Sequence, residues 1–165
     1  MDSDPELFLQ YMSQIDSMSM VAIFFLFLLL FFSALISGTE VAFFSLSKTD
    51  IIKISEQTKE SNPVVTLLQK PRKLLATILI ANNFLNILIV LIFASLGAVF
   101  LKDQNLSLKI IGFTISSGIV KFSIEVILVT FLILLFGEVL PKVYASRRAL
   151  KFCNFMSKPL QLLTI

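Results

Sequence analysis

The stretch VAIFFLFLLLFFSALISGTEVAFFS (residues 21–45) decides the fold of this chain. Residues 21–32 carry no polar side chain, which is typical of a helix that crosses a membrane. Ser33, Ser37 and Glu40 follow, and at about 100° per residue they fall within roughly 60° of arc on one helix face. Polar groups in hydrocarbon are costly unless they meet partners or a ligand. This face therefore predicts either a helix contact or a binding site.

The composition of the whole chain agrees with a membrane protein. Hydrophobic residues make up 56% of its 165 residues, and the mean hydropathy is +0.90, well above the balance of a soluble domain. A single cysteine, Cys153, excludes an internal disulfide framework, and the lack of histidine argues against a zinc site. We predict an integral membrane protein in contact with lipid and without a nucleic-acid partner.

Hydropathy and charge divide the chain into seven segments. In order, they are an external tail (1–17), a first span (18–45), a cytoplasmic helical connector (46–73), a second span (74–101), an external loop or interfacial segment (102–119), a third span (120–143) and a juxtamembrane helix (144–165). Residues 106–118 are apolar but interrupted by Gly and Ser, and we expect them to be interfacial or half-inserted. The predicted fold class is an all-α membrane protein with three transmembrane helices and short juxtamembrane amphipathic helices.

The distribution of Lys and Arg predicts the orientation in the membrane. The connector 46–73 holds six of them and the segment from 142 holds five, whereas residues 102–109 hold two and the tail 1–17 holds none. Positive charge concentrates in cytoplasmic segments. We therefore expect the N-terminus outside and the C-terminus in the cytoplasm, an arrangement that requires an odd number of spans.

The connector contains two helix-start signals. Ser47 followed by Asp50 is typical of a helix N-terminus, and Asn62-Pro63 predicts an N-cap with proline in the first turn. The second short helix is expected to end before Pro71. Residues 46–73 are thus interpreted as a solvated connector on the membrane surface.

The polar residues of the first two spans allow two interpretations. Asn82, Asn83 and Asn86 interrupt the second span, and Asn82 and Asn86 share a face because they are one turn apart. These amides could hydrogen-bond across helices or bind an ion. Ser33 and Ser37 likewise form either a small-residue packing face or part of a binding site.

The third span ends in FGEVLPK (residues 136–142). Pro141 lacks an N–H, and its ring crowds the carbonyl of Gly137 four residues earlier. We expect a helix break that leaves the Gly137 carbonyl free. Glu138 beside it is an ionisable group in or near hydrocarbon, which favours a functional role. Glu40 is either a ligand or an interfacial charge that faces the lysines of the connector.

The polar residues of the three spans lie toward the inner half of each span and offer oxygen atoms only. Hydroxyl, amide, backbone carbonyl and carboxylate oxygens suit a hard cation such as Mg²⁺ or Na⁺. One or two carboxylates make a weak site, which permits release as well as capture. The candidate donors are Ser33, Ser37, Glu40, Asn82, Asn83, Asn86, Gly137 and Glu138.

Three blocks of the sequence carry a family resemblance. SALISGTEVAFFSLS (33–47), LQKPRKLLATILIANNFLNI (68–87) and LLFGEVLPKVYASRRA (134–149) resemble, in the same order, the signature blocks of the CorC/CNNM transmembrane domain. The resemblance implies a transporter rather than an enzyme, located in a bacterial inner membrane. It also implies a homodimer of three-helix protomers, a belt-like juxtamembrane helix, and Mg²⁺ export coupled to Na⁺ entry.

By motif position, the resemblance implies ion ligands on all three spans. These would be Ser33 and Ser37 from the first span, Asn82 from the second, and Glu138 with the Gly137 carbonyl from the third, while Glu40, Asn83 and Asn86 are further candidates. A cytosolic CBS-domain pair and a small C-terminal domain, which the family's full-length chains carry, are absent from these 165 residues.

Two features depart from the family pattern. Ala81-Asn82-Asn83 stands where many members have Gly-Asn-Thr, and the external loop is longer than usual. The acidic start MDSDPELF resembles a gliding-motility-associated branch of the family. The alternative function is therefore a membrane anchor or assembly partner that moves no ion, or a partner that senses Mg²⁺ without transporting it.

Overall fold

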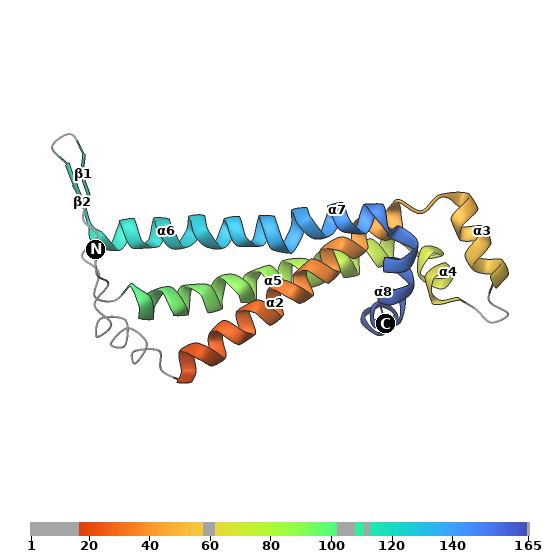
Figure 1. The fold of residues 1–165 in the computed structure, drawn as a ribbon, viewed down its shortest axis with the longest axis horizontal. Helices are drawn as coiled ribbons and strands as arrows, with labels where there is room; N and C mark the ends of the chain where they lie inside the picture. The colour runs from red at the N-terminus through yellow and green to blue at the C-terminus, as the bar shows by residue number, and fades with distance from the viewer. Residues whose placement is uncertain (1–16, 58–61, 102–107, 111–112, 165) are drawn as a thin grey trace, which may run out of the picture.

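The protein is a bundle of three long helices (Figure 1). A computed structural model describes residues 17–57, 62–101, 108–110 and 113–164. The first long helix is α2 (Ser17–Phe44) and the second is α5 (Pro71–Phe100). The third, Ser117–Arg147, is built from α6 (Ser117–Leu132), η1 (Ile133–Val139) and α7 (Leu140–Arg147). All three are long and apolar enough to cross a membrane, which confirms the three predicted spans.

Helix α2 is the centre of the bundle. It packs against α5 along its length and against η1 and α7 toward its C-terminal end. In Figure 1 its N-terminal end diverges from α6, so the three helices are closest where η1 and α7 meet α2.

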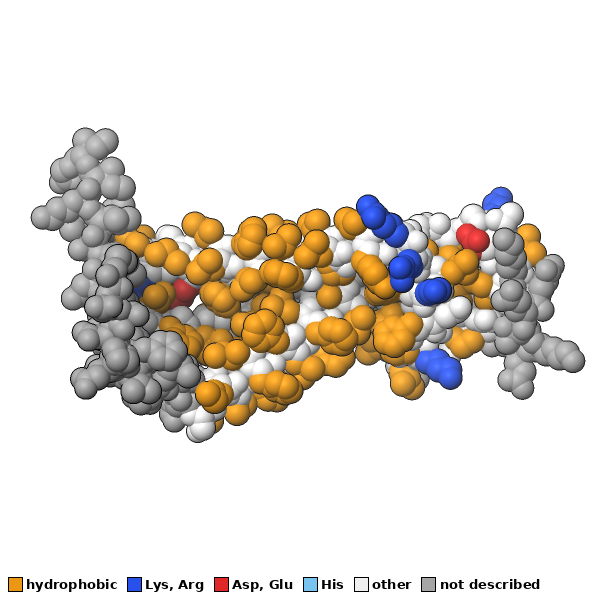
Figure 2. Space-filling view, in the orientation of Figure 1, with side chains coloured by type: hydrophobic (Ala, Val, Ile, Leu, Met, Phe, Trp, Pro, Cys, Tyr) orange, Lys and Arg blue, Asp and Glu red, His pale blue; other side chains and the backbone are white. Residues whose placement is uncertain are grey.

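Two apolar clusters hold the helices together. The inner cluster, which lies toward the C-terminal end of α2, joins α2, α3 (Lys48–Gln57), α4 (Pro63–Leu68), α5, α7 and α8 (Ala149–Leu163). Its members are Ile36, Ala42, Phe43, Ile54, Val64, Leu67, Leu74, Ile78, Ala145, Cys153, Met156 and Leu160. The outer cluster joins α2, α5, α6 and η1 through Leu26, Leu30, Ile89, Leu96, Val129 and Ile133. Large exposed apolar side chains cover the rest of the bundle, as expected for a surface that faces lipid (Figure 2).

The connector forms two short helices, and both predicted start signals are confirmed. At α3 (Lys48–Gln57), the Ser47 N–H donates to Asp50 Oδ2 at 3.2 Å and the Asp50 N–H donates to Ser47 Oγ at 3.2 Å, the reciprocal pattern of a capping box. At α4, Asn62 Oδ1 accepts from the Val64 N–H at 2.9 Å. Helix α4 ends at Leu68, before Pro71.

The helix break expected at Pro141 is wrong. The third span stays helical through Pro141 and instead widens into the π-helical segment η1 just before it. At its end the Leu140 N–H donates to the Leu135 carbonyl, five residues earlier. A wider turn relieves the clash between the proline ring and the carbonyl four residues before it, so the chain need not unwind.

Residues 106–118 contain a β-hairpin, which the interpretation as an interfacial or half-inserted segment did not include. Strands β1 (Leu108–Ile110) and β2 (Phe113–Ile115) pair antiparallel, with Lys109 opposite Thr114. Ile, Phe and Thr favour extended pairing, and this propensity prevails here. Residues 106, 107, 111 and 112 lie outside the described residues. The hairpin lies at the end of the bundle opposite α3, α4 and α8 (Figure 1).

The predicted amphipathic juxtamembrane helix is α8, which confirms this part of the fold class. The chain turns at Arg148, where the backbone φ is −135° and ψ is 40°. One face of α8 is buried through Cys153, Met156 and Leu160 against α2 and α4. The opposite face exposes Lys151, Phe155, Lys158 and Leu162, which follow each other at helical spacing.

Candidate functional site

A polar site lies between the two apolar clusters on all three spans, buried at Ser33 and Gly137 and partly buried at Asn82, Asn86 and Glu138. Ser33 falls between Leu30 of the outer cluster and Ile36 of the inner cluster. The same order holds on α5, where Asn82 and Asn86 separate Ile78 from Ile89. The polar groups are therefore enclosed by apolar packing above and below, where an unmet hydrogen-bonding group is costly.

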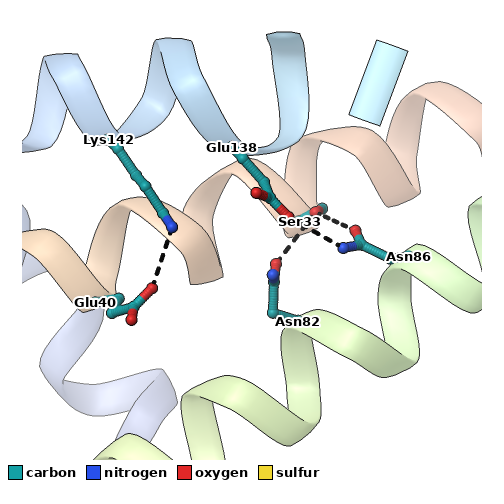
Figure 3. A network of polar contacts seen from close by, with 6 residues as sticks. All are labelled: Ser33, Glu40, Asn82, Asn86, Glu138 and Lys142. Atoms are coloured by element: carbon teal, nitrogen blue, oxygen red, sulfur yellow. Dashed lines mark hydrogen bonds and ion pairs between the residues drawn. The ribbon is translucent and has the colours of Figure 1, made fainter. Parts of the chain in front are cut away.

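Ser33 is the point where the three spans meet (Figure 3). Its side chain is fully buried, and its hydroxyl can donate to Oδ1 of Asn86 at 3.0 Å or to Oδ1 of Asn82 at 3.4 Å. Nδ2 of Asn86 in turn donates to Oε1 of Glu138 at 3.4 Å. One chain of hydrogen bonds therefore links α2, α5 and η1.

Gly137 allows η1 to approach Ser33. A Cβ atom at this position would lie 3.1 Å from Ser33 Oγ, closer than ordinary van der Waals contact, and the residue is buried. The π-helical turn brings Gly137 and the neighbouring Glu138 onto this side of the third span. Segments of this kind are frequent at functional sites. The feature of the sequence that pointed to this part of the third span is Gly137, four residues before Pro141.

Ser37 carries an unpaired buried hydroxyl one turn from Ser33. Its side chain is 1% exposed, and its Oγ has no hydrogen-bond partner among the described residues. Thr39, two residues on, shows the usual solution, because its hydroxyl donates to the Leu35 carbonyl at 2.6 Å. An unsatisfied buried hydroxyl costs about 1–3 kcal/mol. Ser37 is therefore a polar group that a ligand could satisfy.

Comparisons with known proteins identify the family of this chain. A family model, the cyclin M transmembrane N-terminal domain (CNNM), matches residues 23–165. The chain belongs to the CNNM family. It is 33% identical over 144 residues to a UPF0053 protein of Haemophilus influenzae, an alignment that covers 86% of this chain and 30% of that protein.

Two further relatives agree with this membership. The UPF0053 inner membrane protein YfjD of Escherichia coli is 30% identical over 135 residues, which cover 79% of this chain and 28% of that protein. A UPF0053 protein of Synechocystis is 27% identical over 144 residues, covering 85% and 36% respectively. This CNNM domain thus spans about a third of the length of the curated relatives it matches. Its three spans and its relatives make it a multi-pass protein of the bacterial inner membrane.

Glu40 of the CNNM domain pairs with Lys142, not with a lysine of the connector as one interpretation had it. Glu40 Oε2 lies 3.3 Å from Lys142 Nζ, and the two side chains are 36–37% exposed (Figure 3). Glu40 is three residues beyond Ser37, and Lys142 is four residues beyond Glu138. The ion pair therefore lies about one turn from the buried site and joins α2 to α7. It lines an open groove of about 460 Å³ together with Val41, Phe44, Ser45 and Leu75.

The structure separates the candidate residues into three groups. It brings together Ser33, Asn82, Asn86, Gly137 and Glu138, and places Ser37 one turn away. Glu40 is held in the ion pair. Asn83 is exposed on another face of α5 and makes none of these contacts.

The donor set is poor in charge. Within the described ranges, no three His, Cys, Asp or Glu side chains come together, and Glu138 is the carboxylate of the hydrogen-bonded chain. Neutral hydroxyl and amide oxygens with one carboxylate suit a hard cation held weakly, and Mg²⁺ commonly keeps several of its waters in such sites. Whether these residues bind an ion stays a prediction.

Proposed function

We propose that this CNNM domain binds Mg²⁺ among Ser33, Ser37, Asn82, Glu138 and the Gly137 carbonyl, and carries it across the inner membrane. The observation that carries this proposal is the unpartnered, buried Ser37 hydroxyl beside the chain of hydrogen bonds from Ser33 to Glu138. A domain that only anchored a complex would gain nothing from a buried hydroxyl without a partner.

The present hydrogen bonds can be exchanged for ion contacts. The Oδ1 atoms of Asn82 and Asn86 already face Ser33, so a cation could take the place of the hydroxyl proton that they accept. Glu138 supplies the charge that draws in a divalent ion, and the Glu40–Lys142 pair, about one turn from this site, lines the groove. We infer that the groove is the route between the site and the inner surface.

The finer features of transport rest on the resemblance. From the resemblance alone we propose four of them: coupling to Na⁺ entry, outward movement of Mg²⁺, a homodimer, and regulation by a cytosolic CBS-domain pair.

Mg²⁺ should stabilise the purified domain. A ligand that binds only the folded state adds RT ln(1 + [L]/Kd), which is about 2.7 kcal/mol at a hundredfold excess over Kd. We expect a saturable rise in melting temperature with MgCl₂, and a smaller rise with CaCl₂ or with NaCl at matched ionic strength. Reconstituted vesicles with an internal Mg²⁺ indicator then separate transport from binding. A melting temperature indifferent to Mg²⁺ would remove the ion-site proposal, and stabilisation without flux would favour the sensor.

The proposed orientation can be tested with single cysteines. Native Cys153 provides a silent background, because burial raises the pKa of its thiol to about 12 and keeps the reactive thiolate scarce at neutral pH. A cysteine at the exposed position Ser116 should react with an impermeant maleimide added to intact cells, and one at the exposed position Thr49 should react only after permeabilisation. The reverse pattern would invert the proposed topology.

A further inference from the structure

A second polar cavity lies at the end of the bundle, away from the site described above. It measures about 130 Å³ and lies where α4, the start of α5 and the end of α8 meet. Thr66, Leu67, Lys70, Lys73, Gln161 and Thr164 line it. Among the described residues, its lining thus brings two ammonium groups together with hydroxyl and amide groups, and none of these lining residues is Asp or Glu.

The cavity lies where the polar end of the protein gives way to its apolar surface. On α5, Leu75 and Leu79 follow Lys73 by two and six residues and are 42% and 55% exposed. On α8, Leu162 and Leu163 lie between the two lining residues Gln161 and Thr164, and both are exposed. In Figure 2, Lys and Arg side chains gather at this end of the bundle while apolar side chains cover the rest. The cavity is therefore at the depth of the lipid headgroups.

The charged and amide groups of the lining match a phosphate. Ammonium groups bind phosphate as point charges, and the side-chain amide of Gln161 can donate a further hydrogen bond. The hydroxyls of Thr66 and Thr164 already donate to the carbonyls of Asn62 and Leu160. The first turn of α5 adds the positive end of a 30-residue helix beside Lys70 and Lys73. The volume corresponds to about four water molecules at roughly 30 Å³ each, which fits a headgroup phosphate and excludes an acyl chain.

We propose that this cavity binds the phosphate of an anionic phospholipid headgroup, with the acyl chains lying along the exposed Leu162 and Leu163. Basic pockets between helices at the cytoplasmic surface are suited to such headgroups. A lipid bound here would join α4, α5 and α8 and so hold the juxtamembrane helix against the spans. This inference does not depend on the Mg²⁺ site.

The test uses the purified chain in an uncharged detergent, with soluble short-chain lipids as probes. Dihexanoyl phosphatidylglycerol should raise the melting temperature saturably, and dihexanoyl phosphatidylcholine and inorganic phosphate should not. Lys70→Gln/Lys73→Gln should weaken the phosphatidylglycerol response at least tenfold in midpoint concentration. Lys70→Arg/Lys73→Arg should preserve it, which separates loss of charge from loss of fold.

A matched control removes the same charge elsewhere. Lys151 and Lys158 lie on the exposed face of α8 and do not line the cavity, so Lys151→Gln/Lys158→Gln should leave the midpoint unchanged. If this control loses the response as fully as the cavity variant, binding is general surface electrostatics and the proposal is overturned. Equal stabilisation by inorganic phosphate would also overturn it, since the cavity would then bind phosphate that is not part of a lipid.

Discussion

Glu138→Gln should abolish most of the stabilisation that Mg²⁺ confers on this domain. The substitution keeps the size of the side chain and its ability to accept from Asn86, whose Nδ2 lies 3.4 Å from Oε1, but it removes the charge that attracts the cation. Two unit charges 4 Å apart interact by about 1 kcal/mol in water and about 4 kcal/mol at the effective dielectric of a protein surface. Hydroxyl and amide oxygens cannot replace this, so we expect Mg²⁺ affinity to fall at least tenfold.

Three further substitutions show whether the effect of Glu138→Gln is specific to its charge. Ser37→Ala and Asn82→Ala each remove one neutral donor and should weaken the Mg²⁺ response less than Glu138→Gln does. Asn83→Ala is the matched control, because Asn83 is adjacent in sequence but exposed on another face, and it should respond like the parent. Without Mg²⁺, Glu138→Gln should melt at the same temperature as the parent or higher, since a carboxylate within a membrane span is itself costly. A full Mg²⁺ response in Glu138→Gln would favour the non-transporting anchor.

Phe43→Ala should cause the largest loss of stability of any single apolar truncation in α2. Phe43 is 1% exposed in the inner cluster, where α2 meets α4, α5 and α8. Truncating a buried phenylalanine costs about 3–5 kcal/mol in soluble cores, because the cavity collapses only partly. The thermal melt should therefore shift down by several degrees or more, and α8 should become more accessible to protease.

Phe44 provides the control within the same helix turn. It is 48% exposed and lines the groove rather than the cluster, so Phe44→Ala should change the melting temperature little. Equal losses for Phe43→Ala and Phe44→Ala would contradict the inner cluster as the support of α8. Because neither residue belongs to the polar site, both variants should keep the Mg²⁺ response of the parent below their melting temperatures.

The packing of the C-terminal part of α2 depends on one close approach. A Cβ atom at Gly38 would lie 2.8 Å from Cζ of Phe152 and 3.3 Å from the carbonyl oxygen of Pro141. Gly38 therefore lets α7 and α8 pack on α2 at the same level. The local sequence does not identify Phe152 as the neighbour of Gly38. The contact depends on how the second and third spans pack against α2 and on the turn at Arg148 that directs α8 back toward it.

Local features were predictable because their causes are local. The three spans follow from runs of apolar side chains long enough to cross hydrocarbon, and α3 and α4 follow from their caps at Ser47 and Asn62. The shared face of Asn82 and Asn86 follows from helical spacing alone. The amphipathic character of α8 likewise follows from the spacing of its apolar and basic residues.

Tertiary structure decided which polar residues meet, because contact depends on the rotation and depth of each helix relative to the others. The sequence by itself determined the three spans, their candidate oxygen donors and the family blocks. It did not determine that Asn86 rather than Asn83 would face Ser33 and Glu138, or that Lys142 would be the partner of Glu40. The π-helical segment before Pro141 is the physical reason for part of this difference. Its wider turn changes the phase of the third span, so the faces of Gly137, Glu138 and Lys142 do not follow from a regular α-helical repeat.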